Sequence, residues 1–165
     1  MGGDGWREGV SARFGFRDFE TRQGQFLLNG VPVFLRGWSI NPPGRGLPPV
    51  AANRSFAEGY LRFMKEQAGV NAVRIGDGAS TENQHWYDVC DEIGMLIYAG
   101  PYGGVQCPEC QHLGPQQALT SAVTRYQSVL MDTASHPSHV VLILSNEVGL
   151  GKIVILSRFA CCPSR

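Results

Sequence analysis

The sequence has no strong charge of either sign and no long apolar run. Fourteen Lys and Arg residues stand against fourteen Asp and Glu residues. The formal net charge is therefore zero, and nothing indicates a nucleic-acid partner or a membrane surface. No apolar run approaches the roughly 18 residues of a membrane-spanning helix. The start, MGGDGWREGV, lacks the features of a signal peptide, so the compartment stays open, with the cytoplasm as the default.

Cysteine is also scarce, and five residues at irregular spacing do not form the framework of a small disulfide-rich domain. Cys107 and Cys110 form a CxxC pair, but the adjacent Cys161 and Cys162 are a poor second half for a zinc site. We interpret these cysteines as loop and tail thiols. We expect no metal and no other cofactor.

Several catalytic signatures are missing as well. The sequence has no Gly-x-Ser-x-Gly elbow and no HExxH, and the stretch from Gly149 to Lys152 lacks the first Gly and the final Ser or Thr of a P-loop. The length of 165 residues suits one domain. A complete eight-stranded α/β barrel would need about 250 residues.

What the sequence does contain is an alternation of short apolar segments with segments of helical periodicity. The pair Asn29-Gly30 separates the apolar runs 26–28 and 31–35 and predicts a β-hairpin. The order of strands and helices predicts βαβ units and a parallel sheet, and therefore an α/β fold. In chain order, we predict strand 31–37, helix 55–69, strand 72–76, helix 82–93, strand 95–98, helix 115–135 and strand 140–145.

Local signals set the expected ends of these elements. Ser55 followed by Glu58 has the pattern of a capping box at a helix start, and Gly69 is expected to close that helix. Pro115 suits the first turn of the last helix. The stretch 38–54 holds four Pro and two Gly and predicts a loop.

One group of residues has a chemical interpretation. Ser145, Asn146 and Glu147 directly follow the apolar run 140–144, and in parallel α/β sheets the polar residues at the carboxyl ends of strands line the active site. A carboxylate there could act as a general acid. The alternative is that these residues simply begin a loop. Arg74, at the end of another predicted strand, is expected at the same rim, whereas the segment from His136 to His139 is expected to form a structural turn.

Five motifs, taken in order, resemble the catalytic domain of glycoside hydrolase family 2, which includes β-galactosidases, β-glucuronidases and β-mannosidases. They are FGFR at 14–17, FLLNGVPVFLRG at 26–37, GVNAVR at 69–74, WYDVCDEIG at 86–94, and HPS at 136–138 followed by SNE at 145–147.

The resemblance implies a partial (β/α)8 TIM barrel of about four βα units. It also implies that residues 1–22 are a short β remnant of a preceding immunoglobulin-like sandwich and that residues 23–150 form the N-terminal half of the barrel. The remaining residues, 151–165, have no counterpart in the family and form a divergent tail.

The implied activity is hydrolysis of non-reducing-end β-glycosides with retention, and it requires no metal. Glu147 falls on the general acid/base, Asn146 on the residue that binds the sugar 2-hydroxyl, and Arg74 and Asp77 are implied to bind substrate. The implied partner is a carbohydrate substrate. The missing half of the barrel or a second copy of the chain is a further expected partner.

The sequence departs from the family pattern at several positions, and these differences bear on the expected substrate and activity. Residues 38–43 replace an Asn-x-His, residues 75–80 replace an RTSHYP-like segment, and residues 98–100 replace an acidic pair, which favours mannosidase-like or uncharacterised relatives. The family nucleophile follows the seventh strand, and Glu109 is the substitute that the nearby loops offer. We therefore expect the chain alone to be inactive. The alternatives are a non-catalytic carbohydrate-binding module and an inactive fragment.

Overall fold

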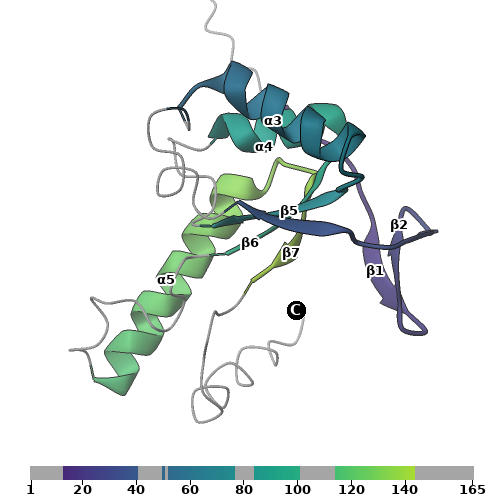
Figure 1. Ribbon diagram of the computed structural model, residues 1–165. Helices are drawn as coiled ribbons and strands as arrows, with labels where there is room; N and C mark the ends of the chain where they lie inside the picture. The colour runs from purple at the N-terminus through teal and green to yellow at the C-terminus, as the bar shows by residue number, and fades with distance from the viewer. Residues whose placement is uncertain (1–12, 41–49, 51, 77–83, 101–113, 144–165) are drawn as a thin grey trace, which may run out of the picture.

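The computed structural model describes residues 13–40, 50, 52–76, 84–100 and 114–143. These residues form two sheets and three long helices (Figure 1). In chain order the elements are β1 (Phe19–Arg22), β2 (Gln25–Leu28), β3 (Val31–Val33), β4 (Gly37–Ile40), α3 (Arg54–Glu66), β5 (Ala72–Gly76), α4 (Gln84–Ile93), β6 (Leu96–Gly100), α5 (Pro115–Thr133) and β7 (His139–Leu142).

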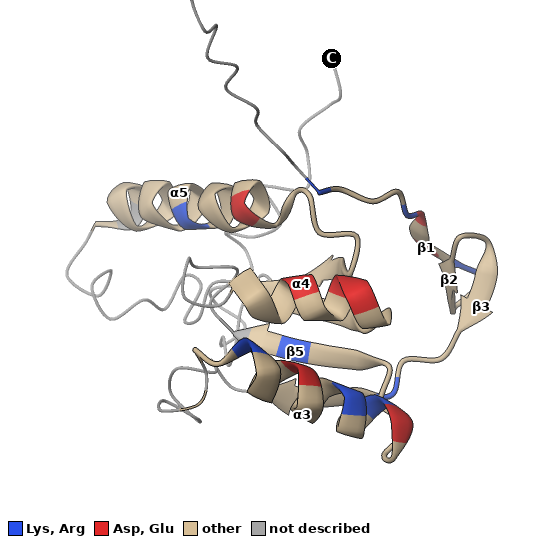
Figure 2. Cartoon of the chain, turned by 90° about the horizontal axis from the view of Figure 1, so that it is seen from above, with Lys and Arg blue, Asp and Glu red and all other residues tan. Residues whose placement is uncertain are grey.

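The larger sheet has the strand order β4-β5-β6-β7, and every neighbouring pair is parallel. Helices α3 and α4 lie over one face of this sheet (Figure 1). In the view of Figure 2, α4 lies between α3 and α5. Each helix connects two neighbouring parallel strands, as right-handed crossover units do. The prediction of an α/β fold with a parallel sheet is therefore confirmed.

The hydrophobic core lies between that sheet and the helices α3 and α4. Val73, Ile75 and Ile97 from the strands are fully buried against Leu61 of α3 and Trp86 of α4. Burial of one such side chain contributes about 1.5–3 kcal/mol. These apolar contacts hold one face of the sheet against the helices. The alternate side chains of the strands lie on the opposite face.

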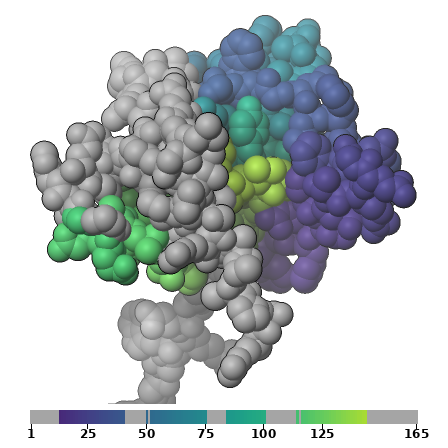
Figure 3. Space-filling view, turned by 90° about the horizontal axis from the view of Figure 1, so that it is seen from below, coloured from purple at the N-terminus to yellow at the C-terminus, as the bar shows by residue number. Residues whose placement is uncertain are grey.

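The smaller sheet is an antiparallel meander in the order β1-β2-β3. Asn29 and Gly30 have φ values of 52° and 77°, as a type I′ turn requires, so the predicted hairpin is confirmed. Gln23 and Gly24 form a second turn of this kind, with φ values of 51° and 76°, which the sequence did not predict. Figure 3 shows this sheet, in purple, beside the yellow-green surface of β7.

Two expected elements differ from the structure. The predicted strand 31–37 is split, because β3 belongs to the antiparallel sheet and the first parallel strand is β4. Strand β4 also occupies the start of the stretch 38–54 that was predicted to be a loop, since its residues pair with β5 from Gly37 onwards. The Pro residues that suggested a loop come after this strand, outside the described residues.

The starts of two helices test the predicted local signals, and one of the two predictions was wrong. Helix α3 is capped by Asn53, whose side chain accepts a hydrogen bond from the Phe56 N–H at 3.2 Å, and not by Ser55. Glu58 pairs instead with Arg62 one turn later. Helix α5 begins at Pro115 as predicted.

Strand β7 begins at His139, one residue before the predicted start, and its other residues are half-buried. Cys90 is buried in α4, whereas the other four cysteines lie outside the described residues. No helix in the described ranges has the length and apolar character needed to cross a membrane.

Candidate functional site

The carboxyl ends of the four parallel strands form a common edge. Ile40, Ile75, Ala99 and Leu142 lie side by side in the register of the sheet, so the chain leaves all four strands at nearly the same level. This is the edge at which open parallel sheets and α/β barrels place their active sites.

The sequence-predicted site residues are distributed unevenly over the described part of the chain. Arg74 lies on β5, two residues before the end of that strand. Asp77, Asn146 and Glu147 lie outside the described residues, and so does Glu109. The structure therefore gives the position of Arg74 and of the strand ends from which the segments with the other residues begin.

Arg74 lies on the face of the sheet opposite the helices. Its strand neighbours Val73 and Ile75 are in the helix-facing core, and side chains alternate along a strand. The register places Ser39, Tyr98 and Val141 in the same row as Arg74. Directly paired residues present their side chains on one face. This row is therefore the last complete row of side chains before the carboxyl edge.

Tyr98 is a residue of this row that the sequence analysis did not single out as a site residue. Its hydroxyl donates a hydrogen bond to the Trp38 carbonyl at 3.2 Å, across β5 from its own strand. A Cβ atom on Gly37 would lie 2.9 Å from the same hydroxyl, so the glycine leaves room for it. Partial burial raises the pKa of Tyr98, and the charge of Arg74 acts in the opposite direction.

Gly100 shows why an acidic side chain is absent at the end of β6. A Cβ atom at this position would overlap the backbone carbonyl of Ile143, whose N–H donates a hydrogen bond to the Ala99 carbonyl at 2.7 Å. No side chain fits there without movement of the β7 backbone. The sequence signal that could have indicated this contact is the glycine itself, at a position where the family pattern has an acidic residue.

Two of the family-like motifs meet at the opposite, amino end of the parallel sheet. The Asn71 side chain accepts a hydrogen bond from the Arg36 N–H and donates one to the Phe34 carbonyl, both at 2.8 Å. The Arg36 side chain in turn donates to the Gly69 carbonyl at 2.6 Å. These contacts join the motifs 26–37 and 69–74 and fix the start of β4 beside the start of β5.

A buried contact between a histidine and a carboxylate joins two further motifs. His136 Nδ1 lies 2.6 Å from Asp91 Oδ2, and Asp91 Oδ1 accepts a hydrogen bond from the Ser138 N–H at 2.9 Å. The exposed fractions of the two side chains are 4% for His136 and 7% for Asp91. Burial would raise the pKa of Asp91, but the hydrogen bonds from His136 and Ser138 outweigh it and hold this pKa below its usual value.

The FGFR motif packs against the same turn. The Arg17 guanidinium donates hydrogen bonds to the His139 carbonyl. A Cβ atom on Gly15 would lie 2.6 Å from the side chain of Pro137, so only glycine allows this close approach. The segment 136–138 is thus a structural turn, as predicted, and three motifs meet there.

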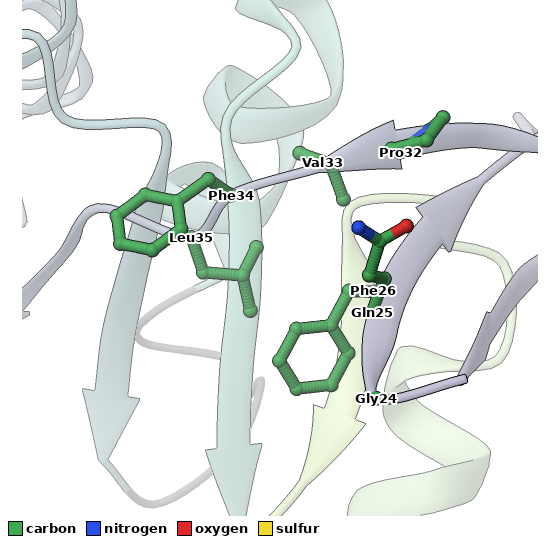
Figure 4. Close-up of a pocket in the computed structure, with 7 residues that line it drawn as sticks. All are labelled: Gly24, Gln25, Phe26, Pro32, Val33, Phe34 and Leu35. Carbon is green, nitrogen blue, oxygen red and sulfur yellow. The ribbon is translucent and has the colours of Figure 1, made fainter. Parts of the chain in front are cut away.

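A hollow beside the N-terminal sheet is mainly apolar. Gly24, Gln25, Phe26, Pro32, Val33, Phe34 and Leu35 line it (Figure 4). The rings of Phe26 and Phe34 are 41% and 78% exposed. None of the described residues that line this hollow is titratable, and Arg74 and Tyr98 lie elsewhere. The described residues also contain no cluster of His, Cys, Asp and Glu that could hold a metal ion.

Comparisons with known proteins identify sequence relatives, although no protein-family model matches the chain. A β-galactosidase of Photobacterium profundum is 27% identical over 146 residues, which are 87% of this chain and 14% of that protein. β-Mannosidase B of Aspergillus clavatus is 30% identical over 148 residues, which are 84% of this chain and 16% of that protein. The chain thus spans about a seventh of the length of the curated relatives it matches.

Solved structures show the same fold. The β-D-mannosidase of Dictyoglomus thermophilum matches 78% of this chain and 16% of its own with a TM-score of 0.58 at 24% identity. The β-glucuronidase of Ruminococcus gnavus matches 89% of this chain and 25% of its own with a TM-score of 0.65 at 22% identity. The resemblance to glycoside hydrolase family 2 is confirmed, and the chain is by this resemblance a relative of the β-glycosidases.

Proposed function

We propose that this chain carries the acid/base side of a retaining β-glycosidase site, with Glu147 as the general acid and later the general base. The observation that carries the proposal is the common carboxyl edge of four parallel strands, beside which Arg74 lies. Glu147 follows Ile143 by four residues, which span at most about 14 Å, so it stays within reach of this edge. The names of the relatives, β-galactosidase and β-mannosidase, support the reaction class.

The chemistry follows from the residue types. Glu147 protonates the leaving oxygen, and a second carboxylate about 5 Å away attacks the anomeric carbon. Water then releases the sugar, with Glu147 taking its proton. Asn146 binds the 2-hydroxyl, while Arg74 and Asp77 contact other parts of the sugar.

The architecture is part of the same proposal. Residues 23–150 form the N-terminal half of a TIM barrel, residues 1–22 are a remnant of a preceding sandwich, and 151–165 are a divergent tail. The proposed boundary between residues 22 and 23 falls at the turn between β1 and β2, within the antiparallel sheet β1-β2-β3. The second carboxylate belongs to a later strand of the barrel, and the structure describes four parallel strands.

The test of Glu147 uses glycoimidazoles of galacto, gluco and manno configuration. In these inhibitors a basic imidazole nitrogen takes the place of the glycosidic oxygen and pairs with the acid/base carboxyl group. Calorimetry compares the chain with Glu147→Gln and with the matched control Glu66→Gln, which changes an exposed Glu at the end of α3. We expect Glu147→Gln to weaken binding at least tenfold, since a hydrogen bond to a charged group contributes about 1.5–3 kcal/mol.

The control and the neutral ligands sharpen this test. Glu66→Gln should leave the affinity within about twofold, and methyl β-glycosides should bind equally well to both variants, because they place no basic nitrogen beside Glu147. Equal weakening by the two substitutions would contradict the assignment of Glu147. The configuration that binds best also tests the expected preference for mannosides.

Turnover of 4-nitrophenyl β-glycosides tests the second part of the proposal. The chain alone is expected to hydrolyse none of them, because the attacking carboxylate is supplied by another part of the barrel. Hydrolysis that is lost in Glu147→Gln would confirm the acid/base but would show that the nucleophile lies in this chain. In that case Glu109→Gln identifies whether the loop carboxylate is the nucleophile.

A further inference from the structure

We propose that Tyr98, with Arg74 beside it, forms the floor of the sugar-binding site, and that the ring of Tyr98 stacks on the C–H face of a neutral pyranose. This inference rests on the proposed function, since it places the sugar at the carboxyl edge of the parallel sheet. It adds a residue that determines which ring orientation the site accepts.

The first argument is the position of the ring. Tyr98 starts on β6, and its hydroxyl reaches the Trp38 carbonyl of β4, so the ring lies across the face of β5 between them. Ala72, a small and buried residue, lies one row nearer the amino end of β5. The small side chain of Ala72 and the missing side chain of Gly37 leave the space in which the ring lies flat.

The second argument is the row beyond Tyr98. Gly76 and Gly100 face each other in the register of the sheet, and neither residue has a side chain. On β5 and β6, the row of Arg74 and Tyr98 is therefore the outermost row of side chains on this face. Among the described residues of β5 and β6, Arg74 and Tyr98 are thus the side chains of this face nearest the carboxyl edge.

The third argument is the direction of the chain after β7. The Ile143 carbonyl occupies the place of a side chain on Gly100, which is the face that carries Tyr98. Ile143, the last described residue before Asn146 and Glu147 in the sequence, therefore lies on this side of the sheet. Helices α3 and α4 cover the opposite face, so among the described elements they do not obstruct this one (Figure 1).

The chemistry of these two side chains fits a sugar. An aromatic face binds the apolar C–H face of a pyranose, and a guanidinium donates hydrogen bonds to hydroxyl groups. The hydrogen bond from Tyr98 to the Trp38 carbonyl uses the hydroxyl hydrogen and fixes the ring, so little ordering is needed on binding. The ring therefore selects for sugars whose C–H face is free of axial hydroxyls on the side that it covers.

The experiment measures binding of methyl β-D-galactoside, methyl β-D-mannoside and the matching glycoimidazoles to the full chain by calorimetry. Tyr98→Leu removes the ring, Tyr98→Phe keeps it, and Ser39→Trp places a bulky side chain in the same row at an exposed position. Phe63→Leu, on the exposed side of α3, is the matched control for loss of an aromatic ring. Circular dichroism melts of all variants show that they fold.

We expect Tyr98→Leu to weaken both kinds of ligand about fivefold to tenfold, Tyr98→Phe to stay within about threefold, and Phe63→Leu to match the parent. Ser39→Trp should block binding, because its side chain would fill the row of Arg74 and Tyr98. If Tyr98→Leu does not fold, this variant still tests the proposal. Equal ligand binding by the parent, Tyr98→Leu and Ser39→Trp would show that Tyr98 is not part of the sugar-binding site. The proposed function would not be affected by that result. A parent chain that binds none of the ligands would overturn both.

Discussion

The buried contact between Asp91 and His136 makes a quantitative prediction about stability. Asp91 accepts two hydrogen bonds, from His136 at 2.6 Å and from the Ser138 N–H at 2.9 Å, and the side chains of Asp91 and His136 are almost fully buried. Removal of one partner from such a pair costs about 3–5 kcal/mol, because the other polar group stays buried without its partner. We expect that loss for Asp91→Ala.

Asp91→Asn should cost less, about 2–3 kcal/mol, because the amide oxygen still accepts the hydrogen bond from the Ser138 N–H while the charge is lost. Small domains have a total stability of about 5–15 kcal/mol, so either change is readily measured. The assay is equilibrium unfolding in urea, monitored by far-UV circular dichroism and tryptophan fluorescence, with the free energy of unfolding obtained by linear extrapolation.

Asp88→Asn is the matched control, because it changes the same residue type on the same helix. Asp88 lies 3.9 Å from Arg54, and the side chains of this pair are 32% and 44% exposed. Exposed pairs of this kind contribute about 0.2–1 kcal/mol. If Asp88→Asn and Asp91→Asn reduced the free energy of unfolding equally, the buried pair would not stabilise the turn before β7 and our reasoning would be refuted.

The pH dependence gives an independent check of the same contact. The pKa of Asp91 is lower in the folded chain than in the unfolded chain, so its contribution is present above the unfolded value of about 3.9 and is lost as the pH falls through the folded value. The stability difference between the parent and Asp91→Asn should therefore be largest near neutral pH and shrink below about pH 4. A difference that grew on acidification would contradict the sign of this shift.

The sequence predicted the fold well where a local rule decides the structure. The pair Asn29-Gly30 adopts positive φ values that most residues avoid, and Pro115 starts a helix because its missing N–H is not needed there. The division of 31–37 into β3 and β4 could not be predicted in this way. It depends on Asn71, 35 residues after Arg36, whose side chain binds the backbone between the two strands.

The cap of α3 shows a similar limit. Ser55 and Asn53 are both good capping residues, and the choice depends on which residue leaves the helical conformation first. Asn53 has φ −90° and ψ 110°, which is extended backbone, and its side chain takes the Phe56 N–H. The choice thus depends on how the segment before the helix enters it, which the local pattern at Ser55 does not specify.

The motifs explain why the family resemblance was visible while the site was only partly predictable. The Asn71 and Asp91 networks and the contact of Gly15 with Pro137 lie at the amino end of the sheet or on the helices, where they hold neighbouring units together. Residues at the amino face of such a fold serve stability, whereas those at the carboxyl edge serve function. Tyr98 lies near the carboxyl edge, and only the sheet register shows that it shares a row with Arg74.

Three further substitutions or labels test other contacts. Asn71→Ala should lower the free energy of unfolding by about 1–3 kcal/mol, because two backbone groups before β4 lose their partners, and urea unfolding measures it. The Cys90 thiol, whose pKa is raised by burial, should resist alkylation at pH 8 until the chain unfolds, and peptide mass mapping would detect an early reaction. Gly100→Ala should cost about 2 kcal/mol or more, since the new methyl group meets the rigid backbone of Ile143 and not a flexible side chain. Its melting temperature should fall well below that of Gly59→Ala, the control at a helical glycine with open space around it, and equal or higher stability of Gly100→Ala would show that β7 does not pass over the end of β6.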